Sequence, residues 1–213
     1  ENQLIKFKHK NLIKEINLNL IGKIQIKNIL MAAIAAQKSN LNFENILKVL
    51  PELKPVEGRL EKIGTIKNNS IVILDYAHTP DALKVCLLNI KEQFPDKKLN
   101  LLFGCGGNRD QNKRAKMGKI ASIYADNIYL TDDNPRSENP TRIRNDIKKG
   151  IKAKKIIEIS NRSTAISEAI KNLKSGDVLV VAGKGHENIQ EIDKKKIKFS
   201  DRKKILIEIN KKN

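Results

Sequence analysis

The stretch "TDDNPRSENP", Thr131 to Pro140, combines acids, an arginine and two prolines directly after the apolar run "NIYL". Asn-Pro pairs mark turns, and a residue before proline avoids the helical region. A polar turn at the carboxyl end of a buried strand is where open α/β sheets bind ligands. Arg136 is therefore a candidate for holding a ligand group. The alternative is that Arg136 forms a surface ion pair with Glu138.

Three more apolar runs are followed by clusters of Gly, Pro, His and charge: "DYAHTPDAL" after "IVIL", "GCGGNRDQNKR" after "LNLLF", and "AGKGHE" after "VLVVA". The segment that follows each apolar run is called its strand exit here. The strand exit after "KIIEI" has fewer such residues and reads "SNRS". "GCGGNRD" lacks the G-x-G-x-x-G spacing of a dinucleotide site, and "AGKGHE" lacks the frame of a Walker A loop. His78 and His186 lie on separate loops, which favours hydrogen bonding over metal ligation.

The elements that would position these clusters form a regular pattern from about residue 63 to residue 213. Apolar strands alternate with amphipathic helices, and cap-then-proline signals at Thr79 and Asn139 mark two helix starts. A further helix follows Ser200, and "IQEID" with "KIKFS" is typical of a terminal hairpin. The pattern predicts an α/β domain with a doubly wound, mostly parallel sheet that helices cover on both faces.

The opening residues, 1–62, have a different pattern. "EINLNL" alternates as a strand does, and two short helices are expected from Ile26 and from Phe43. The loop "PELKPVEGR" follows. This segment contains too little apolar material for a core of its own, so we expect it to be the tail of a domain whose start precedes Glu1.

The composition narrows the classes of partner. The net charge is +18, but the lysines are scattered, aromatic residues make up 4% and Trp is absent. We therefore expect no nucleic-acid binding, which needs a basic stripe with stacking aromatics. No apolar run approaches the roughly 20 residues of a membrane span. Cys86 and Cys105 have no metal-site spacing, which favours a reduced, cytoplasmic setting. We expect a monomer.

The four clusters in this order resemble the Mur ligases of peptidoglycan synthesis. "GKIQIKNILMAAIAA" and "EGRLEKI" resemble the end of that family's central ATP-binding domain, so the resemblance covers nearly the whole chain. It is nearest to the branch that adds meso-diaminopimelate to UDP-MurNAc-L-Ala-D-Glu. The resemblance implies a ligase in which ATP, with Mg²⁺, phosphorylates the substrate's carboxylate before the amine attacks. It also implies that residues 1–62 end the ATP-binding domain and that residues 63–213 form the Rossmann-like C-terminal domain, which binds the amino acid.

Three residues match the family's nucleotide contacts. Asn28 matches the second asparagine of an N-x-x-N pair, although Gln25 replaces the first. Arg59 in "EGR" matches an arginine that reaches ATP phosphate, and Asp75 matches the acid that holds the ribose hydroxyls. The plainer interpretations are a helix cap for Asn28, a solvated charge for Arg59 and a turn cap for Asp75. His78 is expected to order the loop after Asp75.

The amino-acid site is implied by the same resemblance. A guanidinium can bind the distal carboxylate of diaminopimelate in a bidentate fork, Glu187 can pair with its ammonium, and backbone can approach closely at Gly183. The 213 residues contain no G-T-x-G-K-T loop and none of the family's central Mg²⁺ ligands, so we expect the chain alone to be inactive. The competing hypotheses are a basic Rossmann-like module for RNA or other anionic partners, and an NAD-dependent oxidoreductase domain. The residues matched to the amino-acid site are Arg109, Asp133, Asn134, Pro135, Arg136, Gly183 and Glu187.

Overall fold

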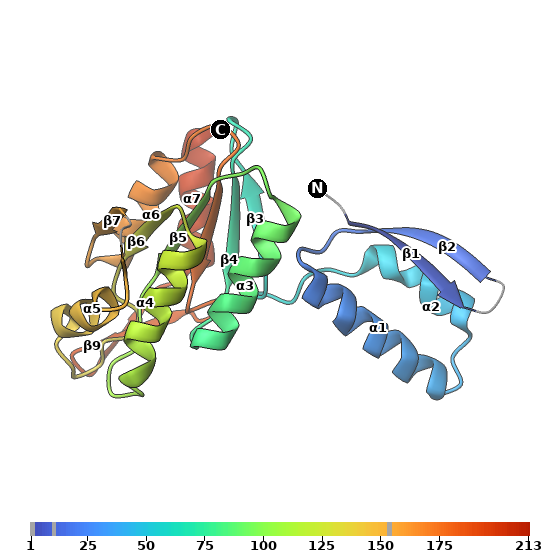
Figure 1. Ribbon diagram of the computed structural model, residues 1–213, viewed down its shortest axis with the longest axis horizontal. Helices are drawn as coiled ribbons and strands as arrows, with labels where there is room; N and C mark the ends of the chain where they lie inside the picture. The colour runs from blue at the N-terminus through green and yellow to red at the C-terminus, as the bar shows by residue number, and fades with distance from the viewer. Residues whose placement is uncertain (1–2, 10–11, 153–154) are drawn as a thin grey trace. The chain divides into compact units, whose positions relative to one another are not determined.

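The computed structural model describes residues 3–9, 12–152 and 155–213, and the chain divides into two compact units (Figure 1). Unit 1 is Glu1–Val56 and unit 2 is Glu57–Asn213. The division precedes the predicted domain boundary at residue 62. The reason is strand β3 (Glu61–Thr65), which pairs with the sheet of unit 2.

Unit 1 is a hairpin packed against helices. Strand β1 (Gln3–His9) pairs antiparallel with β2 (Leu12–Leu18), followed by α1 (Lys23–Lys38), α2 (Phe43–Val49) and the 3₁₀ turn η1 (Leu50–Glu52). The predicted strand and both predicted helices are therefore present. The small core is formed by Phe7, Ile16, Leu18, Leu20, Ile29, Leu47 and Leu50.

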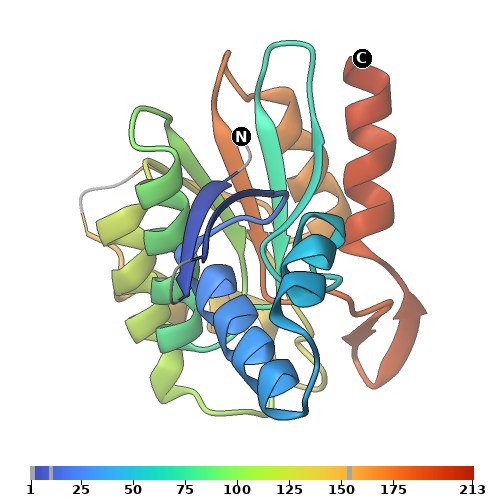
Figure 2. The same cartoon turned by 90° about the vertical axis from the view of Figure 1, so that its right-hand side faces the viewer.

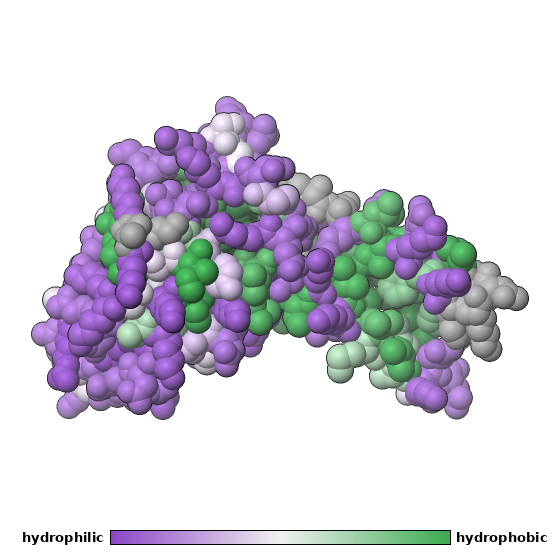
Figure 3. Space-filling model, viewed as in Figure 1, coloured by the Kyte–Doolittle hydropathy of each residue, from purple (hydrophilic) through white to green (hydrophobic). Residues whose placement is uncertain are grey.

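Much apolar surface in unit 1 stays open to solvent. On α1, Leu30, Met31 and Ile34 are 48%, 69% and 49% exposed, although they belong to an apolar helix. Figure 3 shows hydrophobic residues across the visible face of unit 1, whereas that of unit 2 is largely hydrophilic. Exposed apolar patches of this kind often mark interaction surfaces.

Unit 2 contains a six-stranded sheet with the order β3-β4-β8-β5-β6-β7. Strand β3 is antiparallel to β4, and the other neighbours are parallel. Every residue of β4, β5 and β8 is buried, as expected for strands covered on both faces. The predicted doubly wound, mostly parallel sheet is confirmed. The bounds are β4 (Ile71–Asp75), β5 (Leu99–Phe103), β6 (Asn127–Leu130), β7 (Lys155–Glu158) and β8 (Val178–Ala182).

Helices cover both faces of this sheet (Figures 1 and 2). One face carries α3 (Pro80–Gln93), α4 (Asn112–Tyr124) and α5 (Pro140–Lys148), and the other carries α6 (Arg162–Lys171) and α7 (Asp201–Lys212). The predicted caps at Thr79 and Asn139 are present, since each accepts a hydrogen bond from a backbone N–H in the first turn, and Ser200 caps α7 in the same way. The predicted terminal hairpin consists of β9 (Ile189–Ile192) and β10 (Lys195–Lys198).

This topology brings the polar clusters together. Strands β4, β5, β6 and β8 are parallel, so their carboxyl ends meet at one edge of the sheet. The loops after these four strands hold the four predicted motifs. No helix in the described ranges is long and apolar enough to cross a lipid bilayer.

Candidate functional site

A pocket of about 550 Å³ lies among the loops at this edge of the sheet. Six of the seven residues predicted for the amino-acid site line it, and the seventh, Pro135, is buried in the same loop. The carbonyl of Pro135 packs so closely on Gly107 that a Cβ there would lie 2.0 Å from it. The residues that line the pocket are Tyr76, His78, Thr79, Gly104, Cys105, Gly106, Arg109, Asp110, Lys113, Asp133, Asn134, Arg136, Gly183 and Glu187.

Arg136 has an unusual backbone conformation that the β9 segment holds in place. Its φ of 54° lies in the left-handed region, which is costly for a residue with a side chain. The Arg136 N–H donates to the Glu191 carbonyl at 3.0 Å, and the Arg136 carbonyl accepts from Asp193 N–H at 2.7 Å. Strain maintained in this way is typical of functional sites.

The side chain of Arg136 reaches along the pocket wall. Its Nη1 donates to the Gly107 carbonyl at 2.8 Å, and its Nε lies 3.3 Å from a carboxylate oxygen of Glu191. Among the described residues these contacts leave Nη2 without a hydrogen bond. The alternative ion pair with Glu138 is wrong, because Arg136 pairs with Glu191 and the carboxylate of Glu138 is bound by a different arginine.

That arginine is Arg114, a fully buried residue that the sequence did not single out. Arg114 donates to both carboxylate oxygens of Glu138 at 2.7 Å, and Glu138 accepts from the Asn108 N–H at 3.1 Å. The hydrogen bonds from Arg114 are the main reason that the pKa of Glu138 is lowered. The arrangement ties the "GCGGNRD" loop to the "DNPRSENP" loop.

Arg109 is exposed, and both Arg109 and Arg136 lie close to Gly106. A Cβ on Gly106 would lie 3.0 Å from Arg136 Nη1 and 3.9 Å from Arg109 Cγ. Glycine therefore lets the two arginine side chains share one wall of the pocket. Two guanidinium groups at this wall favour a ligand with carboxylate groups.

Glu187 is held as a carboxylate by the fully buried Lys184. Lys184 Nζ donates to Glu187 at 2.8 Å, to the Asn134 side-chain oxygen at 2.9 Å and to the Ile189 carbonyl at 2.7 Å. Burial works against ionisation of Glu187, but the hydrogen bonds from Lys184 and Asn134 lower its pKa overall. Because Nζ already has three acceptors, Lys184 positions Glu187 and Asn134 rather than binding a phosphate.

Asp133 presents a second carboxylate beside Gly183. Its Oδ2 would lie 2.7 Å from a Cβ on Gly183, whose φ of +113° also requires glycine. Gln190 fixes the loop by donating to the Asp133 carbonyl at 2.7 Å. Burial raises the pKa of Asp133, although the nearby positive charges of Arg162 and Lys184 act to lower it.

The predicted nucleotide residues of unit 2 gather around Tyr76. The Arg59 guanidinium lies 4.7 Å from the centre of the Tyr76 ring, and His78 Nδ1 lies 2.9 Å from the Tyr76 carbonyl. His78 therefore orders this loop as expected. Its ring centre is 4.6 Å from that of Tyr76, and the ring of His186 is 5.1 Å away on the same aromatic side chain.

Asp75 does what its plainer interpretation predicted, since it caps two backbone turns. Its Oδ2 accepts from the Leu60 N–H at 2.7 Å, and its Oδ1 accepts from the Ala77 N–H at 2.9 Å. Burial raises the pKa of Asp75, although both backbone hydrogen bonds lower it. A contact with a ribose stays a prediction.

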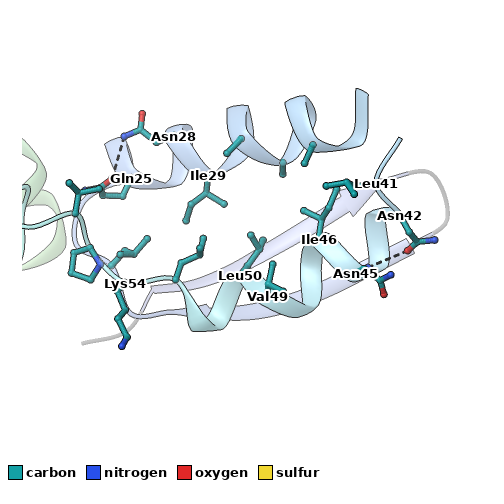
Figure 4. A pocket seen from close by; sticks show the side chains of 17 residues that line it. Gln25, Asn28, Ile29, Leu41, Asn42, Asn45, Ile46, Val49, Leu50 and Lys54 are labelled. Atoms are coloured by element: carbon teal, nitrogen blue, oxygen red, sulfur yellow. Dashed lines mark hydrogen bonds between the residues drawn. The ribbon is translucent and has the colours of Figure 1, made fainter. Parts of the chain in front are cut away.

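Asn28 lies in unit 1, in the second turn of α1. Gly22 is the N-cap of this helix, so the interpretation of Asn28 as a cap is wrong. Asn28 donates to the Gln25 side chain at 3.3 Å, and both residues line an apolar cavity of about 520 Å³ between α1 and α2 (Figure 4). The nucleotide contact of Asn28 stays a prediction. Nowhere in the described ranges do three or more His, Cys, Asp or Glu side chains gather as metal ligands would.

Most of this chain matches known proteins in sequence and in structure. Residues 58–185 match the family model described as "Mur ligase, glutamate ligase domain". The chain belongs to the Mur ligase family. The UDP-N-acetylmuramoyl-L-alanyl-D-glutamate--2,6-diaminopimelate ligase of Rickettsia felis is 46% identical over 200 residues, which cover 93% of this chain and 37% of the relative. The ligase of the same name from Buchnera aphidicola is 44% identical over 199 residues, or 39% of its length.

A solved structure of a Mur ligase with this name has a TM-score of 0.75 and 33% identity, and the match covers 98% of this chain and 42% of that one. A MurF ligase from Thermotoga maritima, in complex with ADP, shares the fold with a TM-score of 0.66 and 17% identity. The chain spans about two fifths of the length of the Mur ligases it matches.

Proposed function

We propose that this chain is the amino-acid-binding part of an ATP-dependent ligase that adds meso-diaminopimelate to UDP-MurNAc-L-Ala-D-Glu in the cytoplasm. The observation that carries the proposal is the charge arrangement of one pocket. Arg109 and Arg136 share one wall, and the carboxylates of Asp133 and Glu187 lie among the same loops. A ligand with both carboxylate and ammonium groups satisfies both sets.

In this proposal unit 2 supplies binding and orientation. The unprotonated amine of diaminopimelate must face the acyl phosphate that ATP forms on the other substrate, and holding the two in line replaces a bimolecular encounter. Mg²⁺ would neutralise charge during phosphoryl transfer. Arg59, Asp75 and Asn28 are proposed to contact the nucleotide.

Unit 1 is proposed to be the end of the ATP-binding domain. Its exposed apolar residues on α1 and the cavity between α1 and α2 fit a segment whose remaining core is formed by further chain. The phosphate loop is not among these 213 residues. The chain alone should therefore show no turnover with UDP-MurNAc-dipeptide, ATP, Mg²⁺ and diaminopimelate.

Calorimetric titration of the purified chain tests the proposal. We expect saturable binding of meso-diaminopimelate at one site, weaker binding of L-lysine, and no binding of a diacid without an amine, such as pimelate. Equal affinity for all three, or ligase turnover above background, would contradict it. RNA binding should be weak and steeply salt-dependent, because the basic charge is scattered.

A further inference from the structure

Arg162 is a fully buried arginine in the "SNRS" exit, the one exit that the sequence marked as plain. It begins α6, and its Nε and Nη2 donate to the two carboxylate oxygens of Asp201 at 2.8 and 2.7 Å. Nη2 also donates to the Ala182 carbonyl at 2.9 Å. In the described part of the chain its Nη1 is buried without a hydrogen-bond partner. An unsatisfied buried donor is costly and needs an explanation.

The carboxylate of Asp133 lies on the pocket side of the same region. Asp133 is 8% exposed and lines the pocket, and among the described residues its oxygens are not counted with the buried side-chain atoms that have no partner. It touches Gly183, the neighbour of Ala182, whose carbonyl Arg162 binds. The groups whose charges act on Asp133 are Arg162, Lys184, Glu187 and Asp201, and Arg162 contributes most.

Arg162 and Asp201 form a two-point ion pair in the interior. Of these two opposite charges, that of Arg162 acts more strongly on Asp133. Arg162 is fully buried, so it acts on a ligand only through Asp133.

We propose that Arg162 is a positioning residue that keeps Asp133 ionised and turned toward the pocket, where Asp133 binds an ammonium group of the amino-acid substrate. The ligand in this inference rests on the proposed function. The coupling between Arg162 and Asp133 is independent of it and can be measured without ligand.

The test is a carbon-detected NMR titration of the Asp133 carboxyl in the ligand-free chain. Arg162→Met should raise the pKa of Asp133 by about one unit or more, because an adjacent opposite charge is lost. Asp201→Asn breaks the same ion pair but leaves the cation, so it should lower that pKa. A purely structural role of the pair predicts shifts of the same sign in both variants and would overturn the inference, as would an unchanged pKa in Arg162→Met.

A second variant covers the case in which Arg162→Met does not fold. Arg162→Met/Asp201→Leu replaces the buried pair with apolar side chains, an exchange that is often neutral for stability. The pKa of Asp133 should stay above its wild-type value, because Arg162 acts on it more strongly than Asp201 does. A value at or below wild type would count against the inference.

Ligand binding provides the second readout. Arg162→Met should weaken the affinity for meso-diaminopimelate at pH values below the Asp133 pKa, by roughly tenfold for a shift of one unit, and the affinity should recover as the pH rises above that pKa. Arg162→Lys should restore part of it. If the pKa responds as described but the wild-type chain binds no diaminopimelate, the coupling is supported and the proposed function is overturned.

Discussion

Replacing Arg136 should reduce the preference for meso-diaminopimelate over L-lysine, since lysine has the same side-chain ammonium but lacks the distal carboxylate. The structure sets the size of the effect. With lysine bound, Arg136 would keep its contacts with the Gly107 carbonyl at 2.8 Å and with Glu191 at 3.3 Å. Its side chain is 25% exposed, so it would not be an unpaired charge in a dry interior.

The discrimination is therefore smaller than the 2–5 kcal/mol or so expected when a fully desolvated partner is lost. One charge-assisted hydrogen bond contributes about 1.5–3 kcal/mol, which corresponds to roughly 10- to 150-fold in relative affinity. Arg136→Ala should lose most of this preference. Arg136→Lys should lose much of it too, because an ammonium lacks the two-point fork of a guanidinium.

The assay compares dissociation constants for both amino acids by calorimetry, and kcat/KM in a full-length enzyme. The matched control is Arg142→Ala, since Arg142 is an exposed arginine of α5 outside the pocket lining. It makes the same change in net charge without touching the pocket. If Arg136→Ala leaves the preference within about threefold of the parent, less than 1 kcal/mol, the assignment of Arg136 to the carboxylate is wrong.

Three further perturbations test other parts of the structure. Gly58→Ala should destabilise unit 2 by several kcal/mol in urea unfolding, because its Cβ would lie 2.5 Å from a backbone nitrogen of the loop after β8. Gly176→Ala, with a similar positive φ but nothing within 4 Å, isolates the conformational cost of about 1 kcal/mol. Glu208 has a pKa lowered to about 2, chiefly by a lysine hydrogen bond, so its stabilisation is complete above its usual 4.5 and is lost as pH falls toward 2. Glu208→Gln should reduce the loss of stability at acid pH and lower the free energy of unfolding at neutral pH by up to about 1 kcal/mol, measured by thermal unfolding across pH. Lys184→Met should release Glu187 and weaken binding of diaminopimelate and lysine alike, by roughly tenfold in calorimetry, the equivalent of one charge-assisted hydrogen bond. An effect on only one ligand would contradict that role.

The periodic elements of unit 2 were predictable because its strands and helices bury regular apolar faces. The caps at Thr79 and Asn139 marked helix starts, since side-chain oxygens there satisfy N–H groups that have no partner within the helix. Strand β3 was not predictable in the same way. Its sequence "EKIGT" has one large apolar residue, and it forms an edge strand only because β4 offers a pairing partner. The division between the two compact units therefore lies before β3, at Val56 and Glu57.

The pocket-lining loops were predictable, but the groups that hold them were not. In a chain with 42 lysines and arginines, nothing local distinguishes a buried cation from a solvated one. The side chains of Arg114, Arg162 and Lys184 are each 0% exposed, and each residue lies in or beside a strand-exit cluster. What distinguishes a buried cation is the carboxylate that it binds. Arg114 binds Glu138, which is 24 residues away in the sequence, and Arg162 binds Asp201, which is 39 residues away. Short-range sequence patterns do not report such pairs.

These buried cations give the pocket its polarity. Arg109 and Arg136 line the pocket, whereas Arg162 and Lys184 are buried and cannot contact a ligand directly. Lys184 holds Glu187 as a carboxylate that is available for an ammonium, and the two arginines present groups that can bind a carboxylate. Lysine bound in the same direction presents only an ammonium at its distal end, and a diacid without an amine presents only a carboxylate there. Meso-diaminopimelate has both groups at its distal end, so it can pair with the carboxylates and with the arginines of this pocket at once.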